Sequence, residues 1–508
     1  MLVSVTEDLR WLKIESCTQE EYTTVRLAYN KPVEGYKFMP QFKKGLWDGH
    51  MNFLKKQYVP LGTIGYLQKT FAAADFPLEV AGWERVATGI TLEEFTAWCG
   101  EFFAGSQWQP RDYQIEAAYE IVERRFSLSE LATSAGKTLI TYMVIAYLLK
   151  HGLAERVMMI VPTTALVIQS AEDFAKYNVG RDLHLDISQI YSGTEESDIA
   201  NVVIGTFQSL VKKDNGFFLG FQAVAVDEVH RAKCASIQKI LSKCWHTGYR
   251  FGLTGTIPKE KYADYLTITS HLGPLVTSVK ARELQDRGFI SKCDITQLEL
   301  HYLTEQERFN LAEAMRFLKS DKGPQAAFQL EREIIITNPH RFGFLVNMMS
   351  RVTKNTLVLF HRIKFGEVLY ERLKTACADK TILYIDGKVT PERRNEILKV
   401  MQENTGVILV ASYATVGTGI SVERIETVVF AESFKSPQII LQAIGRGLRL
   451  KRKLGLPDKV GIIDIVDDFR RKKPAFTNYM YLHGAERRSL YREAEYPFTM
   501  KKVFLVQD

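Results

Sequence analysis

"LATSAGKTLI", residues 131–140, joins the end of a mixed strand-like run to Gly136-Lys137-Thr138 at the start of a helix-length apolar segment. The pattern G-x-x-x-x-G-K-S/T is typical of a turn between strand and helix, where backbone N–H groups surround phosphates and the lysine reaches the outer two. Leu131 stands where that pattern has its first glycine. A Gly-Lys-Thr triplet also arises by chance, so its meaning depends on the surrounding sequence.

Short β-branched runs alternate with helix-length segments from about residue 110 onward. The segment 137–151, for example, stops at Gly152, a typical residue after a helix end. Strand-then-helix repetition predicts parallel sheets covered on both faces, and two series predict two α/β lobes. The expected strands are 156–162, 201–206, 222–228 and 249–256 in the first series, and 355–360, 381–387, 406–412, 426–433 and 459–466 in the second.

Three domains are expected from the 508 residues. Residues 1–85 are rich in Gly, Lys and aromatic residues without strand–helix alternation, which predicts a small α+β domain. Residues 86–290 and 291–508 are expected to form the two lobes, with a polar, helix-prone stretch at 302–342 after the boundary.

The composition favours a cytoplasmic protein with a polyanionic partner. Lys and Arg number 66 against 59 Asp and Glu, a net charge of +7. The six cysteines are scattered and are expected to be reduced thiols. The charged N-terminus does not resemble a signal peptide, and the longest apolar stretch, 142–149, is far below the roughly 20 residues that span a bilayer. No membrane association is expected.

"VDEVH", residues 226–230, ends an apolar run with two carboxylates. A carboxylate at the C-terminal end of a parallel strand faces the crevice where open α/β sheets bind ligands. Asp227 is therefore expected to hold Mg²⁺ together with Thr138, and Glu228 to orient and deprotonate an attacking water. A lone Asp-Glu pair is usually a solvent-facing turn, but its position after a Gly-Lys-Thr helix start favours a nucleotide site.

"QPRDYQIEAA", residues 109–118, lies upstream of the triplet. A glutamine side chain can pair with the N6 and N7 edge of adenine, so Gln114 is the candidate base contact, with Arg111 and Tyr113 framing the ring. An ordinary helix start explains this segment equally well.

"LQAIGRGLRL", residues 441–450, spaces Gln442, Arg446 and Arg449 as i, i+4 and i+7, one face of a helix. Long donors in one line match anionic phosphates, and an arginine reaching a γ-phosphate raises hydrolysis rates greatly. The alternative is a solvated basic face. Gly445 and Gly447 favour the first interpretation, because interior glycines weaken a helix and suggest a close backbone approach.

Seven segments occur in the order that superfamily-two helicases and translocases require. They resemble motifs I, Ia, Ib, II, III, V and VI of that superfamily: "SAGKT", "VPTTALVIQ", "GTFQSL", "DEVH", "LTGT", "VASYATVGTGIS" and "QAIGRGLR". Two further segments, "PQFKKGLWDG" and "YLHGAERRSLY", resemble the recombination and repair helicases of T-even phages. The resemblance covers nearly the full chain and implies two tandem RecA-like lobes preceded by a small N-terminal domain.

The same resemblance implies an ATP-driven, Mg²⁺-dependent motor on branched or duplex DNA. The implied activities are Holliday junction branch migration, fork regression, R-loop unwinding (with RNA as a partner) and strand annealing. The N-terminal domain is expected to bind DNA, the chain to act as a monomer, and recombination or single-strand-binding proteins to be partners. An RNA helicase, a translocase subunit of a restriction-type complex and a binding or annealing protein with an inactive motor are the alternatives.

Site residues follow from the matching motif positions. Departures from the family pattern are Ser134, where motif I commonly has glycine, and Ser421, where many relatives have an aspartate near the ribose. The expected nucleotide site comprises Arg111, Gln114, Ser134, Ala135, Gly136, Lys137, Thr138, Asp227, Glu228, Gly419, Gln442, Arg446 and Arg449. The expected coupling residues are His230, Thr254, Gly255 and Thr256. The expected nucleic-acid contacts in the lobes are Thr163, Thr164, Thr206, Gln208, Phe360, His361 and Thr415.

Residues 43–56 of the N-terminal domain place Trp47 and Phe53 between two lysine pairs, the first of which is Lys43-Lys44. Aromatic rings among lysines are typical of surfaces that stack on bases or bind duplex backbone. Trp47 as part of a small core is the alternative. The lysine pair and Trp47 are therefore candidate nucleic-acid contacts.

Overall fold

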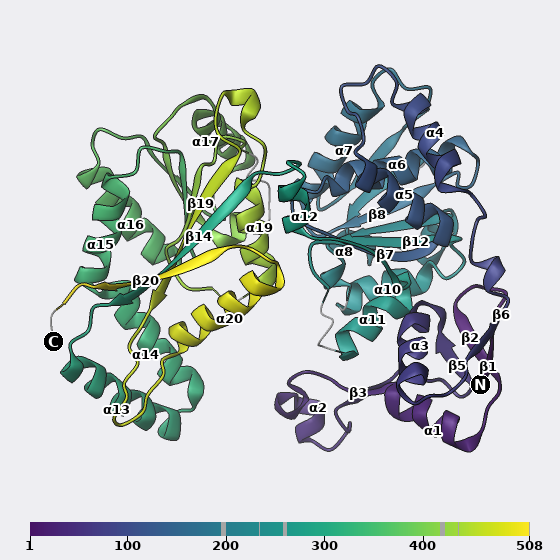
Figure 1. The fold of residues 1–508 in the computed structure, drawn as a ribbon, viewed down its shortest axis with the longest axis horizontal. Coiled ribbons are helices and arrows are strands. Elements are labelled where there is room, and N and C mark those ends of the chain that lie inside the picture. The colour runs from purple at the N-terminus through teal and green to yellow at the C-terminus, as the bar shows by residue number, and fades with distance from the viewer. Residues whose placement is uncertain (195–199, 233, 258–261, 417–421, 435, 507–508) are drawn as a thin grey trace. The chain divides into compact units, whose positions relative to one another are not determined.

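The computed structural model describes residues 1–506 except 195–199, 233, 258–261, 417–421 and 435. The chain forms two compact units, residues 1–132 with 136–279, and residues 133–135 with 280–508 (Figure 1).

A four-stranded sheet in the order β5-β2-β1-β6 opens the first unit. Its buried side chains, such as Val3 and Leu12, form a core with helix residues such as Leu67. The elements are β1 (Leu2–Val5), β2 (Trp11–Ser16), β5 (Tyr58–Pro60), β6 (Glu79–Ala81), α1 (Gln19–Ala28) and α3 (Ile64–Ala73). A mixed α+β domain is thus present where the composition predicted one.

A separate two-stranded ribbon leaves this sheet and carries a short helix at its far end (Figure 1). We call residues 30–52 the projecting segment. It consists of β3 (Asn30–Pro32), η1 (Tyr36–Phe38), α2 (Pro40–Lys43) and β4 (His50–Asn52).

A seven-stranded parallel sheet in the order β13-β7-β12-β11-β8-β10-β9 forms the rest of the first unit. Helix α6 (Lys137–Lys150) is apolar on nearly all sides and almost wholly buried, with Gly152 at φ +65° just beyond its end. The strands are β7 (Phe126–Leu131), β8 (Val157–Val161), β9 (Ile187–Ile190), β10 (Val202–Thr206), β11 (Ala223–Asp227), β12 (Tyr249–Thr254) and β13 (Leu275–Val279). The other helices are α4 (Leu92–Phe102), α5 (Asp112–Arg124), α7 (Thr164–Asn178), α8 (Phe207–Leu210), α9 (Asn215–Leu219), α10 (Ala235–Lys243) and α11 (Tyr262–Leu272).

A second seven-stranded parallel sheet, in the order β16-β17-β15-β18-β19-β14-β20, forms the second unit. Its strands are β14 (Lys292–His301), β15 (Thr356–Phe360), β16 (Ile382–Ile385), β17 (Ile408–Ser412), β18 (Thr427–Phe430), β19 (Lys459–Asp467) and β20 (Phe498–Phe504). Its helices are α12 (Ala281–Asp286), α13 (Glu305–Asp321), α14 (Pro324–Thr337), α15 (Pro339–Ser350), α16 (Ile363–Ala376), α17 (Pro391–Glu403), α18 (Tyr413–Val416), α19 (Pro437–Gly447) and α20 (Tyr479–Glu493).

The predicted fold class is confirmed, since both sheets are parallel and each expected strand is present within a few residues of its predicted bounds. Among the described residues, no helix has the length and apolarity needed to cross a membrane.

Candidate nucleotide site and nucleic-acid interface

The strand order of the first sheet gathers three expected motifs at one edge. β7, β12 and β11 are neighbours, and their C-terminal ends lead into the loop before Lys137, into Thr254–Thr256, and into Asp227-Glu228. Because all three strands are parallel, these segments emerge at the same end of the sheet, where ligands of open α/β sheets bind. The geometry therefore assembles one site from residues more than 100 positions apart.

The loop before α6 has the conformation of a phosphate-binding turn. Ser134 and Gly136 adopt left-handed φ values of +72° and +81°, and Lys137 is the first residue of the helix. Leu131 is the last residue of β7 and fully buried, so the turn begins after it and uses no glycine there. Ser134 takes the conformation that favours the glycine common in the family. The loop thus presents a helix N-terminus and a lysine, the combination that binds phosphate.

Gln114 lies against this loop. Its side chain is buried, and its Oε1 accepts a hydrogen bond of 2.9 Å from the backbone N–H of Arg111, which caps α5. A Cβ on Gly136 would lie 2.3 Å from the Gln114 Nε2, and the φ of +81° at this position disfavours any other residue. Arg111 also lies within 3.5 Å of the Tyr113 hydroxyl. The expected base-framing residues are therefore grouped at the phosphate loop, and their contact with adenine stays a prediction.

Asp227 ends β11 and carries the main electrostatic anomaly of the site. Desolvation and the neighbouring Glu228 carboxylate raise the pKa of Asp227 to about 7, while the Lys137 ammonium and the Glu228 backbone N–H oppose this shift. A divalent cation at the Asp227 carboxylate would relieve both the burial and the repulsion from Glu228. The residues present therefore suit Mg²⁺ at Asp227, with the Thr138 hydroxyl in the first turn of α6 as the second expected ligand.

His230 connects the acidic pair to the loop after β12. Its Nδ1 lies 3.3 Å from the Glu228 Oε2 and 3.4 Å from the Thr254 Oγ1. The Thr254 hydroxyl in turn donates to the Thr256 carbonyl at 3.0 Å. The expected coupling residues, with Gly255 between the two threonines, thus form one chain of contacts that starts at the residue expected to handle water.

The expected nucleic-acid residues of the first lobe follow the next two strands on the other side of β11. Thr163 caps α7 by accepting a hydrogen bond from the Leu166 N–H, and Thr164 is the first, exposed residue of that helix. Thr206 ends β10 and is buried, with its hydroxyl 3.2 Å from the Ser209 hydroxyl, whereas Gln208 is exposed. Thr164 and Gln208 therefore offer the more accessible side chains at this edge.

The motif residues of the second unit leave neighbouring strands in the same way. Phe360 ends β15 but is fully buried and stacks on Tyr384 at 5.6 Å, so its side chain belongs to the core. His361 is exposed, and Thr415 is buried with its hydroxyl bonded to the Ser412 carbonyl at 2.7 Å. Of this group, His361 offers the accessible side chain. Gly419 and Ser421 lie outside the described residues.

The expectation that Gln442, Arg446 and Arg449 share one helix face is wrong for Arg449. Helix α19 ends at Gly447, and Arg449 lies in the segment beyond it, where its carbonyl accepts from the Ser291 hydroxyl at 2.6 Å. Gly447 confirms the predicted close approach, since a Cβ there would lie 2.5 Å from a Val460 methyl group of β19. The backbone contact that requires this glycine also marks the end of the helix.

Glu432, a residue that the sequence did not single out, organises the second set of motifs. Its carboxylate accepts from the backbone N–H groups of His361 and Arg362 at 2.9 and 2.8 Å, and its carbonyl accepts from the Tyr413 hydroxyl at 3.0 Å. The available signal was a carboxylate just after an apolar strand, the same signal that identified Asp227.

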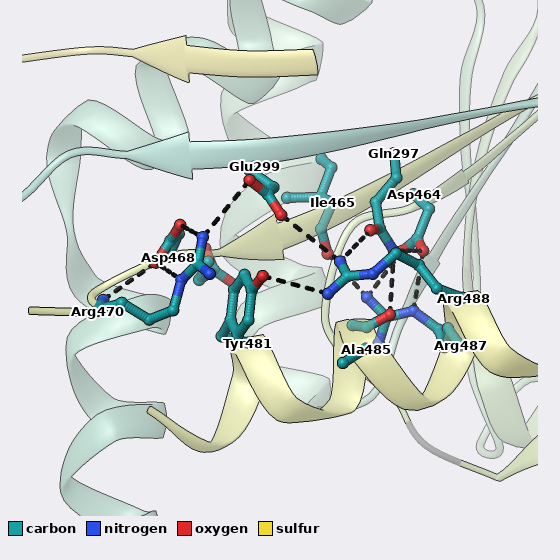
Figure 2. Close-up of polar contacts among 12 residues, drawn as sticks. Gln297, Glu299, Asp464, Ile465, Asp468, Arg470, Tyr481, Ala485, Arg487 and Arg488 are labelled. Atoms are coloured by element: carbon teal, nitrogen blue, oxygen red, sulfur yellow. Dashed lines mark hydrogen bonds and ion pairs between the residues drawn. The ribbon is translucent and has the colours of Figure 1, made fainter. Parts of the chain in front are cut away.

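A buried polar network holds helix α20 against the second sheet (Figure 2). Arg487 pairs with Asp464 of β19 at 2.8 Å and donates to the Ser433 hydroxyl and Phe434 carbonyl at 2.8 and 3.0 Å, just before α19. Arg488 donates to the side-chain oxygen of Gln297. This network therefore ties the C-terminal helix to the segment that leads into α19.

Glu299, His301 and Asp468 in the same region place three potential metal-ligand atoms within 4.8 Å of one another. Arg470 forms a two-point ion pair with Asp468, and Arg488 lies 3.5 Å from Glu299 (Figure 2). Because guanidinium groups already balance the carboxylates, this cluster is explained as an ion-pair network.

The projecting segment exposes Lys43 and Lys44, as expected of a nucleic-acid contact. Trp47 is half-buried and donates from Nε1 to the His50 carbonyl at 2.8 Å, so it helps to pack the segment. Phe53 belongs to the domain core with 8% exposure, so of the two aromatic rings between the lysine pairs only Trp47 stays a candidate contact. The most exposed large apolar residues of the segment are Phe38 and Leu46, at 80% and 76%.

Three family models match successive parts of the chain. Residues 5–81 match the N-terminal domain of DNA helicase UvsW, residues 107–259 match the res subunit of type III restriction enzymes, and residues 340–451 match the conserved C-terminal domain of helicases. Together with the two parallel-sheet lobes and the assembled motifs, these matches define a superfamily-two helicase.

The ATP-dependent DNA helicase uvsW of Enterobacteria phage T4 is 30% identical to this chain over 509 aligned residues, which cover 96% of this chain and 97% of the relative. The chain belongs to the UvsW helicase family. A DNA 3'-5' translocase, XPB2 of Sulfurisphaera tokodaii, is 24% identical over 68% of this chain and 80% of its own length. A fragment of an HsdR subunit of a type I restriction enzyme from Vibrio vulnificus shares the fold, with a TM-score of 0.54 at 17% identity, over 81% of this chain and 74% of the fragment.

Proposed function

We propose that this protein is an ATP-driven motor that remodels branched DNA in recombination, repair and replication. The proposed reactions are branch migration of Holliday junctions, regression of forks, unwinding of R-loops and annealing of strands. The observation that carries the proposal is the single sheet edge that collects Lys137, Asp227-Glu228 and Thr254–Thr256, with His230 in contact with both acidic and threonine segments.

The first lobe would bind the nucleotide through chemistry that its residues supply. Lys137 and the N–H groups of the 134–138 loop would bind the phosphates. Thr138 and Asp227 would hold Mg²⁺, which supplies charge neutralisation when bound. Glu228 is placed to orient the attacking water and accept its proton.

Arg446, Arg449 and Gln442 are proposed to complete the site from the second lobe during turnover. A guanidinium that reaches the γ-phosphate stabilises the charge that develops there and contributes a rate factor of about 10³ or more. Loss of that phosphate removes the contact, so binding and hydrolysis would alternately favour closed and open arrangements of the lobes. The His230–Thr254 contact gives a physical route from the water-handling residue to the rest of the first lobe.

The strand ends next to the nucleotide residues are proposed to grip the DNA backbone. The accessible side chains are Thr164 after β8, Gln208 after β10 and His361 after β15. Beside them lie Thr163, Thr206 and Thr415, whose hydroxyls already take part in hydrogen bonds within the protein. Hydroxyl and amide groups of this kind bind phosphates without reading sequence. Recognition would therefore depend on DNA shape, with Lys43, Lys44 and the surface around Trp47 adding contacts to duplex arms. We expect a monomer in the cytoplasm of the host cell, with recombination or single-strand-binding proteins as partners.

The test is a titration of ATPase activity with five nucleic acids: single-stranded DNA, duplex DNA, a fork, a four-way junction and duplex RNA. We expect the fork and the junction to stimulate hydrolysis at the lowest concentrations, with half-maximal stimulation that moves to higher concentrations as salt rises. Equal or stronger stimulation by duplex RNA would favour the RNA-helicase alternative. Stimulation by none of the five would contradict the proposal.

A further inference from the structure

A cavity of about 220 Å³ lies where the N-terminal domain meets the first parallel sheet. We call it the seam cavity. The two parts pack tightly around it: a Cβ on Gly62 would lie 1.9 Å from the Thr269 carbonyl of α11, and Leu266 of α11 belongs to the N-terminal core. The Thr267 hydroxyl also contacts the Met51 sulfur at 3.4 Å. The cavity is therefore enclosed by two parts of the first unit that pack closely against each other.

Basic side chains line the seam cavity without an acidic one. Arg10 and Lys55 come from the N-terminal domain, and Arg250 and His271 from β12 and the end of α11. None of the described residues lining it is Asp or Glu. Asp8 is the carboxylate that acts on Arg250 from outside the cavity, and it already accepts from Thr6 and from the Arg10 backbone. The cavity thus concentrates positive charge.

Arg250 is the unusual member, because it is 6% exposed and none of the ion pairs among the described residues includes it. Its Nε donates to the Thr247 hydroxyl at 3.0 Å and one Nη to the Trp245 carbonyl at 2.8 Å, both neutral acceptors. Burying a guanidinium without a carboxylate is costly, and buried arginines elsewhere in this chain, Arg341 and Arg487, each have one. An anion in the cavity would supply the missing charge.

The pKa values of two lining residues are lowered first by burial and further by neighbouring positive charges. Burial lowers the pKa of Arg250 to about 10, and the Arg10 charge acts in the same direction. Burial also lowers the pKa of His271, and Arg250, Lys55 and Arg10 all lower it further, against the hydrogen bond to the Thr267 carbonyl.

We propose that the seam cavity binds a phosphate group. Guanidinium and ammonium donors from Arg10, Lys55 and Arg250 match phosphate oxygens, and the volume accommodates a phosphate with part of an attached group. The phosphate comes either from a nucleic-acid backbone or from a free phosphate compound. The first source rests on the proposed function, whereas the second is independent of it.

The test uses the full chain with Arg10→Gln/Lys55→Gln, which removes two charges at the rim and leaves the buried Arg250 in place. The matched control is Arg26→Gln/Lys69→Gln, two exposed residues of the same domain that do not line the cavity. One arm measures binding of a fluorescent DNA fork across a salt series. The other measures the thermal midpoint with sodium phosphate against sodium chloride at equal ionic strength and without nucleotide.

Binding of a backbone phosphate predicts a severalfold loss of fork affinity in the cavity variant and a salt dependence shallower by about one unit of log–log slope, relative to the control. Binding of a free phosphate predicts that phosphate raises the midpoint of the control protein by about 2 °C more than that of the cavity variant, with fork affinity unchanged. The cavity variant and the control variant both retain the phosphate loop at Lys137. A difference between their phosphate-induced shifts in thermal midpoint therefore arises from the cavity alone. If the cavity variant matches the control in both arms, the proposal is overturned. Wild-type protein that fails to bind the fork contradicts the proposed function, and the phosphate arm then still decides the cavity.

Discussion

At the residue scale, Lys451 shows how a buried amine caps the end of a functional helix. Its side chain is fully buried, and its Nζ donates to the Gly447 and Arg449 carbonyls at 2.6 and 3.1 Å, at the end of α19. These carbonyls have no intrahelical partner, so the lysine acts as a C-terminal cap. The main chain that carries Arg449 is therefore held by hydrogen bonds from the Lys451 amine.

Burial lowers the pKa of Lys451 to about 8, against the opposing charges of Asp458 and Glu426. The unfolded chain, with the ordinary lysine pKa, binds the proton more tightly, so this residue's contribution to stability increases as pH rises from about 8 toward 10. We predict that wild type gains about 2 kcal/mol of unfolding free energy relative to Lys451→Met between pH 7.5 and 10. Urea denaturation at both pH values measures the difference. The exposed neighbour Lys453→Met is the control, and an equal gain in wild type and Lys451→Met would contradict the argument.

At the element scale, helix α20 acts as a brace for the second sheet. Arg487 and Asp464 are both buried, and the Tyr491 hydroxyl and Gln297 amide also donate to Asp464 at 2.9 and 2.7 Å. The same arginine reaches Ser433 and Phe434, so the network extends to the start of α19.

Removing one partner of a buried ion pair leaves the other charge uncompensated. We predict that Arg487→Met lowers the unfolding free energy by about 3–5 kcal/mol, and that adding Asp464→Asn recovers part of this loss. Arg492→Met, an exposed change on the same helix, should cost less than about 0.5 kcal/mol. Denaturant unfolding of the three variants provides the measurement, and a double variant no more stable than the single one would argue against charge burial as the cause.

The projecting segment is the element expected to contact duplex DNA through Lys43 and Lys44. Each phosphate contact contributes about 0.9 to the slope of log affinity against log salt. We predict that Lys43→Gln/Lys44→Gln weakens fork binding and reduces this slope by about 2 if both lysines meet phosphates. Fluorescence anisotropy between 50 and 200 mM salt provides the measurement. If the salt slope of Lys43→Gln/Lys44→Gln equals that of the reference variant Arg26→Gln/Lys69→Gln, the projecting segment does not contact DNA phosphates.

Strands with a continuous run of apolar residues were predictable from the sequence, whereas β7 and β14, in which buried polar residues alternate with apolar ones, were not. β7 reads "FSLSEL", and its buried Glu130 accepts from the Ile257 N–H and the Ser278 hydroxyl. β14 carries Gln297 and Glu299, which share the partner Arg488 on α20, about 190 residues away in sequence. Polar residues interrupt the apolar pattern of such strands. Their hydrogen-bonding partners are distant in sequence, so the sequence does not show that these polar residues can be buried. The end of α19 and the burial of Phe53 could not be predicted for a similar reason. Both depend on tertiary packing, in the first case on the contact of Gly447 with Val460.

At the scale of the whole molecule, short motifs indicated which residues form the candidate site, whereas the alternation of strands and helices indicated only the fold class. Strand order cannot be read from spacing, yet it is the order β7-β12-β11 that turns three separate motifs into one site. The motif residues could be proposed from the sequence because phosphate binding and water activation restrict which side chains can serve. The residues that hold them in place, Glu432, Lys451 and Arg487, serve through packing and hydrogen bonds that many sequences could supply.

The central claim is that hydrolysis at the Lys137 site drives movement of DNA. Lys137→Ala removes the ammonium group from the phosphate loop while leaving the expected DNA contacts in place. The direct measurement is branch migration of a synthetic four-way junction by wild type and Lys137→Ala, with fork affinity and ATPase activity measured on the same samples. We predict that the variant binds the fork within about twofold of wild type but loses at least about a hundredfold in hydrolysis and shows no ATP-dependent migration. A variant that moved junctions at the wild-type rate would contradict the account.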